Sequence, residues 1–323
     1  MHVPIHDMSF ILRAAAERTE GASATQLRSL VASMGGNPQI QVGIVTERPF
    51  SAAVRRTFQL GLELGRPWIV ALDADVLLLS DAIERLGNFC ACADGAVFAI
   101  TPLVHCKFFG GFCYKGVHCY PRRYLERALA LIGPSNSAAD LRPENAVIRA
   151  MDAKGFKPFA PPMVVGVHDH EQSYKHIYLK SRLRGRREAA DAAAPHSDSL
   201  SFVSRLADTD PDYLVAMWGL RDGRTDAAAA DPRSHYDWDA PYPEFVSRLA
   251  AGGLAEKPPL SNSAAGFAER TIASHNFHAD TCTPRWIRER FGFGEPVAAV
   301  LGRMGVPILA RAEPAAPAHA LAS

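Results

Sequence analysis

The sequence has almost no net charge and no long hydrophobic run. Its 35 basic and 34 acidic residues give a formal charge of +1, so no overall field favours nucleic acid or an anionic membrane surface as a partner. No stretch approaches the roughly 18 consecutive apolar residues that a membrane-spanning helix needs. Residues 1–7 lack the basic start and apolar core of a secretory signal peptide. We therefore expect a cytoplasmic protein that neither spans a membrane nor binds nucleic acid.

Paired cysteines with the spacing of a structural zinc site are also missing. The chain has 6 cysteines, and all but one lie between Cys90 and Cys119, with His105 and His118 beside them. None of them forms the Cys-x2-Cys unit that is typical of such sites. Small buried side chains in a reducing compartment explain these cysteines better than a zinc cluster does.

The composition is that of a folded globular protein. Hydrophobic residues make up 48% of the 323 residues and charged residues 21%, which is ordinary for such a protein. This length suffices for one large domain or two ordinary ones. An alanine-rich stretch begins at residue 188, and we place a domain boundary there. Residues 1–187 form the predicted catalytic domain, and residues 188–323 a mainly helical accessory region with a loose tail.

The most informative stretch is Pro67–Leu77. An apolar run from Trp68 to Leu72 is followed directly by Asp73 and Asp75. Such a run predicts a buried parallel strand, and the carboxyl ends of such strands are where open α/β sheets bind ligands. Side chains at alternate strand positions point the same way, so the two carboxylates would face one cation, Mg²⁺ or Mn²⁺. A strand that merely ends in a polar turn is the alternative.

A strand, a helix and a second strand lead into this stretch. Gln39–Thr46 is apolar and β-branched, and it ends at the polar pair Glu47 and Arg48. A helix over Ser51–Leu64 then connects it to the strand at Trp68, which gives a right-handed βαβ unit and a parallel sheet. Elsewhere we expect strands at residues 3–5 and 95–100, helices at 8–16, 26–34, 121–132 and 144–154, and a sheet edge at 156–167.

A second polar cluster lies further along the chain. It begins with His168, Asp169 and His170, and the basic residues Lys175 and Lys180 follow, with several arginines behind them. A cation held by two aspartates has room for one nitrogen ligand, which His168 or His170 can supply. The basic residues can neutralise a diphosphate. Each of these residues alone is more often structural, but their order supports a joint site.

This order resembles that of the GT-A fold glycosyltransferases, specifically the family 2-like nucleotide-sugar transferases of bacteria. The resemblance covers roughly residues 1–185. It is carried by the strand with Asp73-Ala74-Asp75, the loop Lys107–Gly111, the segment Arg142-Pro143-Glu144, and the segment His168–Lys180. It implies a Rossmann-like α/β fold and a nucleotide-diphosphate sugar donor, UDP- or GDP-linked, whose sugar passes to a carbohydrate or other hydroxyl acceptor.

The resemblance also implies roles for individual residues. The metal would be held by Asp73, Asp75 and His168. The catalytic base would be Glu144, which stands before Asn145 where the family has a Glu-Asp pair, or else Asp169. The donor would contact these residues: Glu47, Arg48, Asp73, Lys107, Lys175 and Lys180.

Three other functions share part of this pattern. A haloacid-dehalogenase-like phosphatase also has Asp-x-Asp after an apolar strand, but the glycine that it needs shortly afterwards is missing. A nucleotidyltransferase also holds metal with two carboxylates, but residues 1–20 contain no glycine-rich phosphate loop. A GT-A domain that has lost activity and acts as a binding or scaffold protein is the non-enzyme alternative.

Overall fold

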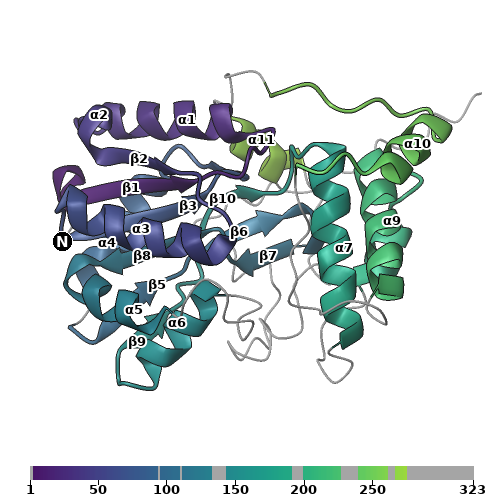
Figure 1. Cartoon of the computed structure of the whole chain (residues 1–323). Helices are drawn as coiled ribbons and strands as arrows, with labels where there is room; N and C mark the ends of the chain where they lie inside the picture. The colour runs from purple at the N-terminus through teal and green to yellow at the C-terminus, as the bar shows by residue number, and fades with distance from the viewer. Residues whose placement is uncertain are drawn as a thin grey trace, which may run out of the picture.

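The structure is a computed structural model, which describes residues 3–93, 95–109, 111–132, 143–190, 199–226, 239–260 and 266–274. Two β-sheets lie in its first two thirds, and helices follow in the C-terminal part (Figure 1). The predicted fold class, an α/β architecture with a mostly parallel sheet flanked by helices and a mainly helical C-terminal region, is confirmed.

The larger sheet has the strand order β2-β1-β3-β8-β5-β9. Strand β8 runs antiparallel to both of its neighbours, and the other strands run parallel to one another. The carboxyl ends of β1, β2 and β3 therefore meet at one edge, where open α/β sheets bind ligands. The strands are β1 (Met8–Arg13), β2 (Val42–Val45), β3 (Trp68–Asp73), β5 (Val97–Ile100), β8 (Val117–Pro121) and β9 (Lys157–Phe159).

The smaller sheet begins where β3 ends. Its order is β4-β10-β6-β7, and β10 runs parallel to β6 but antiparallel to β4. Only Ala74 and Asp75 separate β3 from β4. The chain therefore passes from one sheet to the other at Asp73 and Asp75, two of the predicted metal ligands. The strands are β4 (Val76–Leu78), β6 (Leu103–Cys106), β7 (Gly111–Tyr114) and β10 (Val164–His168).

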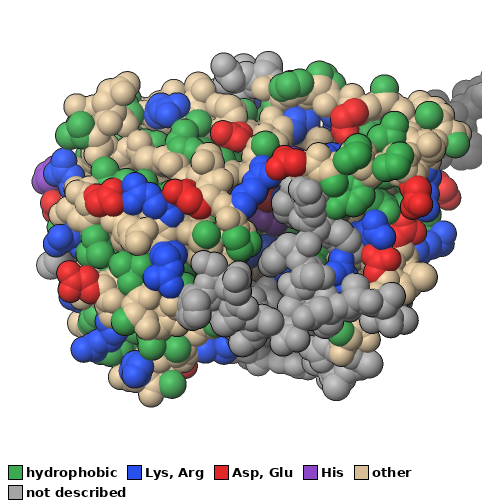
Figure 2. Space-filling view, viewed as in Figure 1, with side chains coloured by type: hydrophobic (Ala, Val, Ile, Leu, Met, Phe, Trp, Pro, Cys, Tyr) green, Lys and Arg blue, Asp and Glu red, His purple; other side chains and the backbone are tan. Residues whose placement is uncertain are grey.

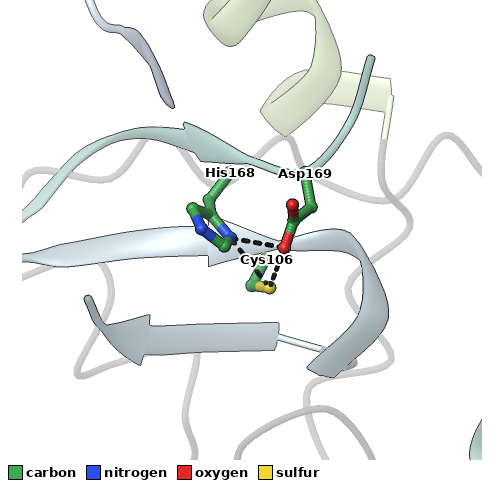
Figure 3. A group of neighbouring side chains, drawn as sticks. All are labelled: Cys106, His168 and Asp169. Atoms are coloured by element: carbon green, nitrogen blue, oxygen red, sulfur yellow. Dashed lines mark hydrogen bonds and ion pairs between the residues drawn. The ribbon is translucent and has the colours of Figure 1, made fainter. Parts of the chain in front are cut away.

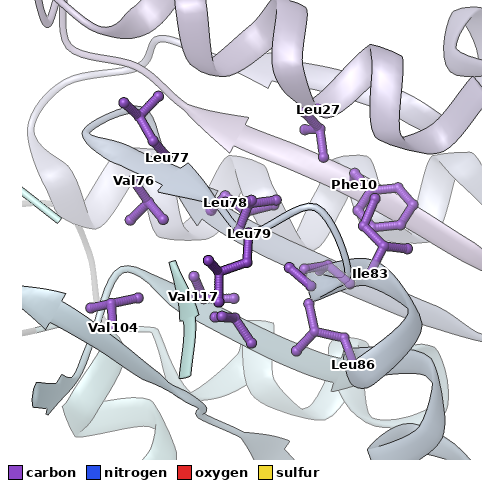
Figure 4. Close-up of a cluster of buried hydrophobic side chains, with 14 of the residues drawn as sticks. Phe10, Leu27, Val76, Leu77, Leu78, Leu79, Ile83, Leu86, Val104 and Val117 are labelled. Atoms are coloured by element: carbon purple, nitrogen blue, oxygen red, sulfur yellow. The ribbon is translucent and has the colours of Figure 1, made fainter. Parts of the chain in front are cut away.

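Helices cover both faces of the larger sheet. The alternation of side chains along a strand sends Phe10 and Leu12 into a core with α1 and α4, whereas Ile11 packs with α3, α5 and α6 on the other face. Figure 4 shows the first of these cores, which continues to Leu77 and Val104 of the smaller sheet. These helices are α1 (Glu20–Ser33), α2 (Pro38–Gln41), α3 (Phe50–Leu64), α4 (Ala82–Cys92), α5 (Leu125–Leu131) and α6 (Pro143–Asp152).

Most of the C-terminal helices share a core with α7 (Tyr174–Ala190), whereas α11 packs against the smaller sheet. Helix α7 runs through the predicted boundary after residue 187. Its partner α9 (Pro211–Asp226) approaches it at Gly185, Gly219 and Gly223. A Cβ on Gly223 would lie 1.9 Å from the carbonyl oxygen of Arg182, so only glycine permits this contact. The remaining helices are α8 (Ser199–Ser204), α10 (Pro243–Ala251) and α11 (Phe267–Ser274).

None of the helices in the described ranges is long and apolar enough to cross a membrane. Short 3-10 turns complete the secondary structure, at Ile5–Asp7, Lys107–Phe109 and Arg122–Tyr124.

Several predicted elements differ from those in the structure. The helix predicted at 8–16 is wrong, because β1 occupies Met8–Arg13, pairs with β2 and β3, and has all its side chains buried. The helix predicted to begin at Pro121 begins later, because Pro121 ends β8. The strands β6, β7 and β8 were not predicted, since runs of 4 or 5 residues are too short to show a period.

The glycine contact between α7 and α9 yields the first prediction. Replacing Gly223 by alanine should push the two helices apart and lower the free energy of unfolding by about 2 kcal/mol or more. Chemical denaturation of the two proteins measures this difference. Gly95→Ala is the control, because a Cβ there meets no heavy atom within 4 Å. Equal losses in both variants would contradict the close helix contact.

Candidate functional site

The candidate site lies where the larger sheet meets the smaller one. It collects the carboxyl end of β1, the β3–β4 turn and the end of β10, and one residue each from α6 and α7 reaches it. Figure 2 shows acidic and basic side chains next to one another near the middle of this face, between α3 and α7. The charged residues form two groups, one around Arg13 and one around Lys180.

Arg13, the last residue of β1, joins two of the predicted acids. Its Nε lies 2.8 Å from Asp73 Oδ1, and its Nη1 lies 2.6 Å from Glu144 Oε1. The Arg13 side chain is only 3% exposed, whereas that of Asp73 is 27% exposed. A buried guanidinium requires carboxylate partners, so Arg13 holds Asp73 in place at the opening of the site.

Glu144 is enclosed by donors. Tyr120 donates a hydrogen bond to Oε1 at 2.7 Å, and His118 Nε2 lies 3.1 Å from Oε2. The second ring nitrogen of His118 contacts Thr101 Oγ1 at 2.9 Å. Burial raises the pKa of Glu144, but Arg13 and His118 outweigh it and hold that pKa well below its ordinary value. Glu144 is therefore better suited to orient Arg13 than to accept a proton.

The second group is centred on Lys180 of α7. Its Nζ contacts Asp75 Oδ2 and lies 2.9 Å from Asp169 Oδ1. The other oxygen of Asp75, Oδ1, is buried, accepts no hydrogen bond from the described residues, and lies 3.6 Å from His168 Nε2. A buried acceptor without a donor is costly, so this oxygen is the candidate ligand atom for a cation at this site.

Through its other ring nitrogen, Nδ1, His168 contacts the side chains of Asp169 and Cys106 (Figure 3). Its Nδ1 lies 2.9 Å from Asp169 Oδ2 and 3.3 Å from Cys106 Sγ. The three side chains are buried, and Cys106, His168 and Asp169 are close enough to hold a metal ion together. Burial lowers the pKa of His168, but the carboxylates of Asp169 and Asp75 outweigh it and raise that pKa well above its ordinary value.

The carboxylates crowd one another. Burial raises the pKa of Asp73, Arg13 opposes this, and the negative charges of Asp75 and Glu144 raise it further. Gly116 keeps space beside them, because a Cβ there would lie 2.8 Å from Val76 Cγ2 and 3.1 Å from His168 Cδ2, and its φ of +72° also favours glycine. The crowding and the open carboxylate oxygen fit a divalent cation.

The structure brings some of the predicted residues together and separates others. Asp73, Asp75, His168, Asp169 and Lys180 lie in the two groups described above, and Glu144 reaches them through Arg13.

Four predicted donor contacts lie outside these groups. Lys107 forms ion pairs with Asp210 at 2.7 Å and Asp212 at 2.6 Å, next to α9. Lys175 lies over the ring of Tyr242. The other two have partners of their own outside the site. Glu47 lies 3.6 Å from Arg56 Nε, and Arg48 donates to the carbonyl oxygen of Ala15 and pairs with Asp239.

The sequence did not predict three residues of the site. Arg13 stood inside a stretch that was predicted to be helical, and Cys106 ended a strand that was not predicted. Glu17 follows β1, and burial together with the nearby Asp75 raises its pKa to about 7. The sequence offered one signal for Arg13 and Glu17, namely their position at and after the end of an apolar run. The spacing of the apolar residues in that run did not distinguish a strand from a helix.

Comparison with known proteins finds similarity to solved structures only. A scan against protein-family models and a search of curated proteins found no match. Similar solved structures include a glycosyltransferase involved in glycosylation of the major capsid of PBCV-1. It has 13% sequence identity and a TM-score of 0.38, and the match covers 51% of this chain and 95% of that one.

Two further structures are similar over more of this chain. A Desulfovibrio desulfuricans G20 protein named as a nucleotide-diphospho-sugar transferase has 9% identity and a TM-score of 0.35, with 66% of this chain and 98% of that chain covered. A cytidylyltransferase from Leptospira borgpetersenii serovar Hardjo-bovis has 11% identity and a TM-score of 0.34, with 64% and 96% covered. Similarity of this kind does not determine an activity, which depends on the side chains of the site.

The contacts of Glu144 yield the second prediction. Glu144→Gln should leave the Arg13 charge only partly compensated and lower the free energy of unfolding by about 3 kcal/mol. Thermal and chemical denaturation at neutral pH measure the loss. Glu63→Gln is the matched control, because Glu63 pairs with Arg56 on the surface, where such pairs contribute little. An unchanged melting temperature in Glu144→Gln would show that this carboxylate does not compensate Arg13.

Proposed function

We propose that the protein is a metal-dependent glycosyltransferase that moves a sugar from a nucleotide-diphosphate donor to a hydroxyl acceptor, in bacterial polysaccharide or glycoconjugate synthesis. The observation that carries this proposal is the position of Asp73 and Asp75. They stand at the junction of two sheets, at the carboxyl ends of parallel strands, and a buried Asp75 oxygen faces His168. This is a setting in which α/β proteins bind phosphorylated ligands.

The charge balance supports a divalent cation. Among the described residues, the carboxylates of Asp73, Asp75, Glu144 and Asp169 face Arg13, Lys180 and His168, whose pKa the carboxylates raise. Mn²⁺ or Mg²⁺ would take the place of the proton on His168 Nε2, with Asp73, Asp75 and that nitrogen as its protein ligands. When bound, such an ion stabilises negative charge on the departing diphosphate.

The residues of the chain supply the remaining chemistry. Lys180 has a side chain that is 29% exposed, so its ammonium can turn from Asp75 toward a diphosphate oxygen and stabilise the charge that develops there. Arg13 and Glu144 hold Asp73 at the site opening. This arrangement stabilises the leaving nucleoside diphosphate, UDP or GDP, rather than the acceptor.

A base is needed for the acceptor hydroxyl. The predicted bases, Glu144 and Asp169, both have lowered pKa values because cations hold them. These two carboxylates are therefore better suited to hold Arg13 and Lys180 than to accept a proton.

The metal ligands yield the third prediction. Asp75→Asn should weaken the binding of UDP or GDP in the presence of Mn²⁺ by roughly tenfold or more, which is about 1.4 kcal/mol, because the anionic ligand is lost and the shape is kept. Isothermal titration calorimetry measures the affinity, and a thermal shift identifies which nucleotide binds. Asp81→Asn is the control, since Asp81 pairs with Arg85 at the surface. Unchanged affinity in Asp75→Asn would contradict the metal assignment.

The products distinguish the competing functions, which is the fourth prediction. With nucleotide sugars and Mn²⁺, the protein should release nucleoside diphosphate, and EDTA should stop the release. A nucleotidyltransferase would instead consume a nucleoside triphosphate and a sugar phosphate and release pyrophosphate. A phosphatase would release inorganic phosphate. Nucleotide binding without any turnover across donors and acceptors would favour the inactive scaffold.

A further inference from the structure

His168 lies between two sets of partners. Its Nε2 is directed toward Asp75 Oδ1 at 3.6 Å, and its Nδ1 toward Asp169 Oδ2 at 2.9 Å. The ring is buried, with 8% of the side chain exposed. A metal binds the neutral imidazole, in which one nitrogen donates and the other accepts. The partner of one nitrogen therefore decides what the other can do.

Asp169 is itself fixed from several sides. Its Oδ1 accepts from Lys180 Nζ at 2.9 Å, while its Oδ2 meets His168. Its backbone N–H donates to the carbonyl oxygen of Asp75 at 3.2 Å. Asp169 therefore links the turn after β10 to the turn between β3 and β4, and both of its carboxylate oxygens have defined partners.

The backbone of Asp169 also takes an unusual conformation. Its φ is +64°, in the left-handed region, which aspartate and asparagine tolerate better than most residues because their short side chains bond locally. This turn directs the carboxylate back onto the ring of the preceding residue, His168 (Figure 3). A residue that followed the extended strand would direct its side chain to the opposite face.

We propose that Asp169 is a positioning residue that keeps the proton of His168 on Nδ1 and thereby presents Nε2 as a ligand for the divalent cation at Asp75. This inference rests on the proposed function. A carboxylate that accepts from one nitrogen of a metal-binding histidine fixes its tautomer and orientation and makes the other nitrogen a better ligand. Asp169, predicted as a reserve base, thus acts through His168 and not on the acceptor.

A second reading places a metal among Cys106, His168 and Asp169. The three contacts there are 2.9, 3.3 and 3.8 Å long, and the shortest is an ordinary hydrogen-bond distance. Lys180 already compensates Asp169. The observations therefore favour a hydrogen bond between Asp169 and His168.

The experiment compares Asp169→Asn with the wild type. Asparagine keeps the size of the side chain and tolerates the left-handed backbone, but it holds the histidine proton less well. We expect Mn²⁺, measured by calorimetry with UDP or GDP present, to bind roughly 10- to 100-fold more weakly. Pulsed EPR should detect a histidine nitrogen coupled to Mn²⁺ in the wild type, and this coupling should diminish in Asp169→Asn.

Two further variants separate positioning from a purely structural role. In a His168→Ala background, Asp169→Asn should have no further effect on Mn²⁺ affinity, because the residue acts through the ring. Cys106→Ser tests the other Nδ1 contact and should lower the affinity and the nitrogen coupling less than Asp169→Asn does. A melting temperature for each variant confirms that it is folded.

The outcomes are distinct. Equal Mn²⁺ affinity and nitrogen coupling in wild type and Asp169→Asn would overturn the inference, and so would additive losses with His168→Ala. If Cys106→Ser lost metal as strongly as Asp169→Asn, the metal would lie among the three residues of Figure 3, which also overturns it. Mn²⁺ binding without any nitrogen coupling would remove His168 from the ligand set and leave the proposed function intact. Absence of any nucleotide or Mn²⁺ binding in the wild type would instead contradict the proposed function itself.

Discussion

The site depends on sharing two cations among four buried or half-buried carboxylates. Arg13 bridges Asp73 and Glu144, and Lys180 bridges Asp75 and Asp169. Removing a carboxylate from water is unfavourable unless a partner compensates it. The acids can therefore gather at the junction of the two sheets only when both cations are in place. Each cation comes from a different part of the chain, β1 or α7.

This constraint connects the helical C-terminal part to the chemistry. Lys180 reaches the acids only if α7 lies in the observed position, and α7 is held by close packing against α9 at Gly185, Gly219 and Gly223. Ion pairs from Lys107 to Asp210 and Asp212 hold the same helices against the smaller sheet. A lysine that was predicted to contact the donor thus has a structural role in the described residues.

Much of the fold followed from local pattern. The apolar run before Asp73 and the βαβ unit that precedes it are found as β2, α3 and β3. The run Met8–Arg13 was assigned to a helix, and its apolar residues, Met8 and Phe10 to Leu12, show no period of two. A strand that is buried on both faces looks like this, and only its pairing with β2 and β3 identifies it.

By itself, the sequence determined that acids follow a buried strand and that a histidine and basic residues stand about a hundred positions later. Their chemistry was visible because residue type and spacing along one strand are local properties. Only the tertiary structure decided which cation meets which acid, since Arg13, Asp75, His168 and Lys180 come from four separate elements. It also decided which ring nitrogen of His168 faces Asp75, because that orientation depends on the left-handed turn at Asp169 and on contacts between two strands that are distant in sequence.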